Sequence, residues 1–209
     1  DSLIRKYEKL KRKKAAIFIE PQLDTGYPDI VVVEYSSTPE LEWTTSRNGL
    51  SSTDIKILFY IQTQKNASID SIIENLGYSL DVVNKSIKKL YSCKLVHLSK
   101  SQKYVRNTKL ENYSKIRKII AIEAKIDKWQ EAIRQANNNV CFSTESYILM
   151  NKESCSKKII DTCKEIGIGI ILVNGKIQTI QKSTERTFPV SYASLQFNEW
   201  IMRNKHRRN

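Results

Sequence analysis

The stretch that most constrains the fold is 118–136, where the hydrophobic pattern changes its period. Its first part, 118–126, is a short apolar run rich in isoleucine, which is typical of a buried strand. Its second part, 129–136, places apolar residues at helical spacing. A strand that leads directly into an amphipathic helix indicates an α/β domain, and we expect the rest of the chain to be organised around this pair.

Charged side chains lie near the end of this predicted strand. Side chains alternate across a strand, so Glu123 and Lys125 lie on one face and the neighbouring isoleucines lie on the other. A carboxylate and an ammonium there are costly unless they face a cleft, a metal or each other. Asp127 is placed to cap the following helix, and Gln135 on that helix could lean back toward the strand end.

The charge balance favours a polyanionic partner. The 209 residues carry a formal net charge of +13 and a pI near 9.5, which points first to nucleic acid and second to an anionic membrane surface. A generally basic protein without such a partner remains the alternative. The chain is long enough for one domain, or for one domain with a small insert.

Membrane, secretory and zinc-binding classes are not expected. No apolar run approaches 18 residues, and no secretory hydrophobic region is present. The four cysteines form no CxxC pair, so free thiols in a reducing cytoplasm are the simplest interpretation. The cysteines are Cys93, Cys141, Cys155 and Cys163.

The remaining pattern predicts elements on both sides of a helical insert. Before it we expect a helix over 3–14, strands over 16–20 and 29–35, and near 42–44 either a further strand or a connection to the insert. After it we expect a strand over 145–150, a helix over 156–166, a hairpin of 169–173 and 176–180 joined at Asn174-Gly175, and a last helix over 195–203.

The insert, residues 49–107, has the plan of a winged helix-turn-helix. Three short helices (from a cap at 51–53 to 62, then 69–76 and 80–93) precede a hairpin over 95–105. The predicted recognition helix is 79–89. Residues expected to contact phosphates and base edges are Ser79, Asn84, Lys85, Lys88 and Lys89 on the helix, with Lys100 and Lys103 at the hairpin tip. The alternative is a dimerisation or protein-docking module; His97 is assigned to the wing or the core.

Asp29, which follows Gly26-Tyr27-Pro28, and Glu123-Ala124-Lys125 together resemble the signature of the PD-(D/E)xK nuclease superfamily. The two parts are 94 positions apart, and the insert accounts for that distance. Gln135 and the segments 146–149 and 167–173 are also similar to the family, so the resemblance covers about 8–35 and 117–182. It implies an α/β restriction-endonuclease-like core, a central mixed sheet flanked by helices, over 1–48 and 108–209.

The resemblance also implies roles. Phosphodiester hydrolysis needs an activated water and charge stabilisation at the phosphate, and Mg²⁺ (or Mn²⁺) held by carboxylates supplies both. Lys125 would position the water or stabilise charge, and Gln135 would orient the lysine or the phosphate. The implied metal ligands are Asp29, Glu123 and the backbone carbonyl of Ala124, with Glu20 as a further ligand and Glu8 as a weaker one.

The sequence therefore predicts a metal-dependent endonuclease placed on duplex DNA by its insert. Cleavage of both strands would call for a homodimer. One rival is a DNA-binding regulator whose nuclease-like core is only a scaffold, and another is a subunit of a larger defence or mobile-element complex. Glu123 and Lys125 could also be an ion pair on an exposed sheet, Glu20 a strand-end charge and Glu8 a solvated one.

Overall fold

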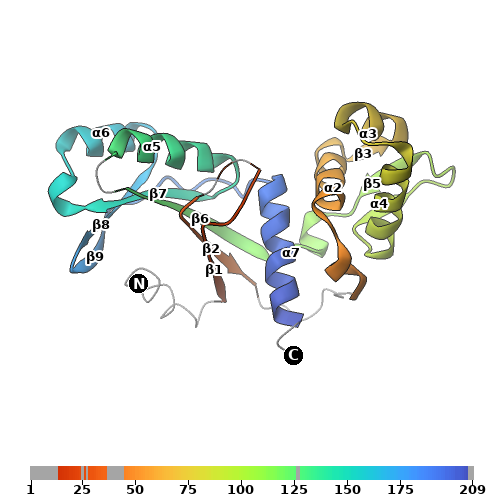
Figure 1. Cartoon of the computed structure of the whole chain (residues 1–209), viewed down its shortest axis with the longest axis horizontal. Helices are drawn as coiled ribbons and strands as arrows, with labels where there is room; N and C mark the ends of the chain where they lie inside the picture. Colours follow the sequence, from red (N-terminus) through yellow and green to blue (C-terminus); the bar gives the residue numbers. More distant parts are fainter. Residues whose placement is uncertain (1–13, 25, 27, 37–44, 126–127, 207–209) are drawn as a thin grey trace. The chain divides into compact units, whose positions relative to one another are not determined.

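The computed structural model describes residues 14–24, 26, 28–36, 45–125 and 128–206. These residues divide into two compact units (Figure 1). The core unit takes its described residues from 1–37 and 116–189, and the insert unit takes them from 38–115 and 190–209. Apart from Lys14, the predicted helix over 3–14 with Glu8 lies outside the described residues, as do the predicted strand near 42–44 and the capping residue Asp127.

The core unit is built on a six-stranded mixed sheet of order β1-β2-β6-β7-β8-β9. The first three strands pair antiparallel, β6, β7 and β8 are parallel, and β9 returns antiparallel through the tight turn at Gly175. This confirms a mixed α/β architecture. The strands are β1 (Ala15–Ile19), β2 (Ile30–Tyr35), β6 (Ile116–Ala124), β7 (Glu145–Asn151), β8 (Gly169–Asn174) and β9 (Lys176–Gln181).

Two helices, α5 (Trp129–Asn138) and α6 (Lys157–Glu165), cover one face of this sheet (Figure 1). Their apolar stripes pack on β7 and β8 because those strands present alternate residues to this side. The buried residues of this layer include Ala132, Ile133, Ile148, Ile159 and Ile170. A second cluster, with Val32, Ile120, Ile122, Tyr147 and Ile171, lies on the opposite face.

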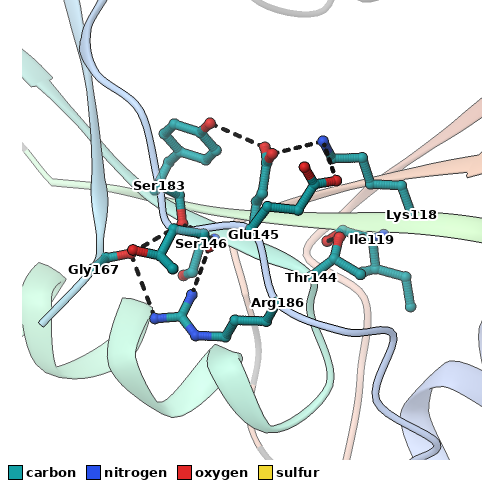
Figure 2. Close-up of polar contacts among 11 residues, drawn as sticks. Lys118, Ile119, Thr144, Glu145, Ser146, Gly167, Ser183 and Arg186 are labelled. Carbon is teal, nitrogen blue, oxygen red and sulfur yellow. Dashed lines mark hydrogen bonds and ion pairs between the residues drawn. The ribbon is translucent and has the colours of Figure 1, made fainter.

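A polar network ties β6 to β7 (Figure 2). The Lys118 ammonium lies 2.6 Å from a Glu145 carboxylate oxygen and 3.3 Å from Glu185, and the Tyr147 hydroxyl donates to Glu145 at 3.0 Å. Burial would lower the Lys118 pKa, but the hydrogen bonds and charges of the two glutamates outweigh it, so the pKa is raised. The network therefore favours a charged lysine and fixes the strand whose far end carries Glu123.

The segment after β9 is fastened to the same region (Figure 2). The Arg186 guanidinium donates to the carbonyls of Ile166 and Gly167 at 3.3 and 3.4 Å, and Ser146 N–H donates to the Ser183 hydroxyl at 3.1 Å. These bonds satisfy backbone groups at the start of β7 and after α6 that the hydrogen bonds of the sheet and of the helix do not satisfy.

The insert unit contains the predicted three helices and hairpin. Serines begin each helix: Ser51 makes a capping box with Asp54, and the hydroxyls of Ser68 and Ser79 accept N–H groups of the first turns. A short strand that the sequence analysis did not predict, β3, completes a three-stranded sheet of order β3-β5-β4. The elements are η2 (Thr45–Gly49), α2 (Ser52–Gln64), β3 (Asn66–Ser68), α3 (Ile69–Leu76), α4 (Leu80–Ser92), β4 (Val96–Leu98) and β5 (Tyr104–Asn107).

The last helix, α7 (Tyr192–His206), belongs to the insert unit, whereas the predicted domain boundaries assigned it to the core. The reason is its packing against α2, where Leu195 enters the same apolar cluster as the three predicted helices. A buried ion pair adds to this contact: the Arg47 guanidinium lies 2.7 Å from a Glu199 oxygen and donates to the Tyr113 carbonyl at 3.2 Å. The observed insert unit thus also includes residues on both sides of the predicted insert, 49–107.

No helix in the described ranges is long and apolar enough to cross a bilayer. All four cysteines carry free thiols.

Candidate functional site

The register of β2 and β6 brings Asp29 and Glu123 together. Ile30 lies opposite Ile122, so the next positions, Asp29 and Glu123, face each other at the strand ends. The Ala124 N–H donates to the Asp29 carboxylate at 2.7 Å, although the two residues are 95 positions apart. The long insert therefore separates two carboxylates that the sheet makes neighbours.

Glu123 is a buried acid with one unsatisfied oxygen. Its exposed fraction is 2%, its Oε1 accepts from the Asn139 side-chain amide at 2.6 Å, and its Oε2 has no hydrogen-bond partner. Burial raises the pKa of Glu123, and the negative charge of Asp29, to which a protonated Glu123 can donate a hydrogen bond, raises it further, while the Asn139 hydrogen bond and the Lys125 charge oppose these effects. The resulting pKa is about 7.

Lys125 and Gln135 complete the predicted set. The Lys125 ammonium lies 4.0 Å from the Asp29 carboxylate, and both side chains are partly exposed. Gln135, from the exposed edge of α5, reaches a hollow of about 260 Å³ next to Glu123, and its Oε1 has no hydrogen-bond partner. The hollow is lined by Gly26, Pro28, Glu123, Arg134, Gln135, Asn138 and Asn139.

Glu20 is not brought into this group. Its N–H donates to the Asp29 carbonyl at 2.9 Å, but its φ of 46° interrupts the alternation of β1, and its side chain is exposed. Within the part of the chain that the structure describes, no three His, Cys, Asp or Glu side chains are arranged to hold a metal ion. The oxygen donors that fit a hard cation are those of Asp29 and the unpartnered Glu123 Oε2.

Three residues of this site were missed from the sequence. Asn139 orients the Glu123 carboxylate, while Arg134 and Asn138 line the hollow from the exposed side of α5. The available signal was the polar run 137–139 directly after the helix. Asparagines at a helix end are also common as capping residues, so such a run does not by itself indicate a site.

The insert unit presents the predicted recognition helix, α4, with its basic residues outward. Lys85 and Lys88 are exposed, and Asn84 is half-buried. Two predicted contacts already have partners within the unit. Ser79 caps α4, and the Lys89 ammonium lies 3.4 Å from a carboxylate oxygen of Asp54, a buried acid whose pKa is lowered.

Burial raises the Asp54 pKa, but hydrogen bonds from Ser51 and Ser86 and the Lys89 charge overcome that effect. Lys89 therefore supports the fold as well as the basic surface.

The hairpin supplies a second basic edge. Lys100 and Lys103 are exposed at its tip, and Tyr104 and Arg106 on β5, which the sequence analysis did not select, are exposed as well. His97 contacts the Thr108 hydroxyl at 3.2 Å, which agrees with its assignment to the wing.

The family model for winged helix-turn-helix DNA-binding domains matches residues 50–96, which span α2, β3, α3, α4 and the start of β4. Residues 50–96 are a winged helix-turn-helix DNA-binding domain. Comparison with curated proteins and with solved structures gave no match. The match supports DNA as the ligand class of the insert unit, and α4 has the position that the recognition helix takes in the helix-turn-helix plan.

Proposed function

We propose that this protein is a metal-dependent DNA endonuclease, with its catalytic site at the facing ends of β2 and β6 and its winged helix as the grip on duplex DNA. The observation that carries this proposal is the buried Glu123 Oε2, which lacks a partner and lies beside the Asp29 carboxylate. Burying an ionised carboxylate oxygen without a partner is costly, so the arrangement favours a cation at this position.

Asp29, Glu123 and the Ala124 carbonyl would hold Mg²⁺ or Mn²⁺. A bound divalent ion supplies charge stabilisation at the phosphate and lowers the pKa of a bound water. Asn139 holds the Glu123 carboxylate in one orientation. The Lys125 ammonium, partly exposed next to Asp29, positions the attacking water or stabilises the charge that develops on the phosphate.

The mixed sheet is compatible with the restriction-endonuclease-like core that the Glu-x-Lys motif predicts, and that finer fold assignment is part of the proposal. Gln135 is proposed to orient Lys125 or the phosphate, because its amide reaches the hollow that Glu123 lines. A homodimer would be needed to cut both strands.

A DNA-binding regulator, or a DNA-binding subunit of a larger complex, fits the observations at least as well. In that case the core unit is a scaffold, and the winged helix alone accounts for the partner. The contacts of Asp29 favour it, since its carboxylate already accepts from Ala124 N–H and lies near the Lys125 ammonium.

Plasmid nicking separates the two functions. The endonuclease nicks supercoiled plasmid in Mg²⁺ or Mn²⁺ and not in EDTA, and Lys125→Ala lowers the rate by roughly 10²–10³-fold with an unchanged melting temperature. Lys128→Ala is the matched control, because this exposed lysine lies three residues further along. A wild-type protein that binds duplex DNA but nicks it with neither metal is a regulator or a subunit.

A further inference from the structure

A row of side chains on α4 has no role in the core of the winged helix. Leu80, Asn84 and Lys88 follow one another at intervals of four residues, so they lie along one edge of the helix, and Tyr91 continues that edge. Leu80 is 54% exposed and Tyr91 53%, although both side chains are large. The buried side of the helix is formed instead by Val83, Ser86, Ile87 and Leu90.

The charge around this row favours nucleic acid as its partner. From Leu80 to Arg106 the chain has seven basic residues and a single acid, Asp81. The other acids of the winged helix, Asp54, Asp70 and Glu74, lie on α2 and α3. An exposed leucine among lysines on a recognition helix is suited to the major groove, where phosphates flank the base edges and thymine presents a methyl group.

We propose that the row reads neighbouring base pairs, with Leu80 packed against the C5-methyl group of a thymine. A helix rises 1.5 Å per residue, so Leu80 and Asn84 are about 6 Å apart along its axis, close to the rise of two base pairs. Asn84 then hydrogen-bonds an adenine edge while Leu80 covers a thymine methyl about two steps away. Lys88 and Tyr91 contact the phosphates beyond them. This inference rests on the DNA binding of the winged helix, not on cleavage.

Replacing thymine by deoxyuridine tests the proposal, because it removes the methyl group and keeps the pairing edge. Duplexes are first selected from a random pool by the full-length protein in EDTA, and each thymine of the preferred site is then replaced singly. At one position the wild-type affinity is expected to fall about 3- to 10-fold, the size of one buried methyl contact. Leu80→Ala is expected to bind the thymine and uracil duplexes equally at that position.

Val82→Ala is the matched control. Val82 is also an exposed apolar residue of the first turn, at 37%, but it lies on the opposite edge of the exposed surface. Val82→Ala should lose as much affinity as wild type does when the thymine methyl group is removed. Thermal melting followed by circular dichroism checks that both variants fold. The proposal is overturned if wild type is indifferent to every replacement, if Leu80→Ala keeps the effect, or if no preferred sequence emerges. If the methyl effect is found but the protein does not nick plasmid, this inference stands and only the proposed nuclease activity is refuted. If the protein nicks plasmid but shows no methyl effect, the nuclease proposal stands and this inference is refuted.

Discussion

Glu123→Gln should stabilise the metal-free protein in a pH-dependent way. The folded-state pKa of Glu123 is raised from 4.5 to about 7, so the folded protein binds this proton more tightly than the unfolded chain does. The carboxyl therefore supports the fold below pH 4.5, and that contribution is lost as the pH rises through about 7. Glutamine resembles the protonated acid at every pH, keeping an oxygen for the Asn139 amide.

The size of the effect follows from the pKa difference. Each unit is worth about 1.4 kcal/mol, and Glu123 is too buried for solvent to screen much of it. The advantage of Glu123→Gln over wild type in the free energy of unfolding should grow by about 2–3 kcal/mol between pH 5 and pH 8. Urea unfolding in EDTA measures it, and hydrogen exchange of the β6 amides assigns the transition to the core unit.

Glu145→Gln is the control, since it makes the same chemical change in the same sheet. The Glu145 carboxylate lies 2.6 Å from the Lys118 ammonium, so its loss should destabilise the protein at pH 8 instead. The argument that an ionised Glu123 destabilises the folded protein would be refuted by either of two results. One is a gain in the free energy of unfolding of Glu123→Gln that does not change with pH, and the other is a lower stability of this variant at pH 8.

Four further substitutions test other parts of the structure. Lys88→Ala should weaken DNA binding on all sequences and reduce the salt slope by roughly 0.9 without changing stability; Lys89→Ala should do the same and also lower the melting temperature, because it removes the Asp54 ion pair. Gly169→Ala should unfold the core unit at lower urea, since a Cβ there would lie 2.2 Å from the Tyr147 ring. Glu199→Ala should destabilise the insert unit by up to about 3–5 kcal/mol, measured by urea unfolding, because it removes a buried carboxylate that the Arg47 guanidinium contacts at 2.7 Å.

The parts of the fold that the sequence predicted well are those determined by local pattern. β6 and α5 follow from a change of hydrophobic period, and α2, α3 and α4 begin at serines that cap them. Gln135 lines the same hollow as Glu123, which agrees with the prediction that this side of the helix faces the strand end.

What the sequence could not predict depends on contacts between distant residues. The apolar positions of α7 can be recognised in the sequence, but they do not indicate whether the helix packs on the sheet or on α2. The outward direction of Lys89 follows from helical spacing, whereas its pairing with Asp54 needs the packing of α4 on α2. Asn139 is likewise a site residue only because α5 ends above Glu123.

The place of Glu199 in the chain constrains the order of folding during synthesis. Arg47 and Tyr113 stand on either side of the winged helix, and the Glu199 carboxylate that binds the arginine is translated 86 residues after Tyr113. A nascent chain can therefore emerge with its recognition helix complete while the apolar cluster still lacks Leu195 and the Arg47 ion pair with Glu199 has not formed. DNA binding by ribosome-bound chains should accordingly strengthen only once α7 has left the exit tunnel.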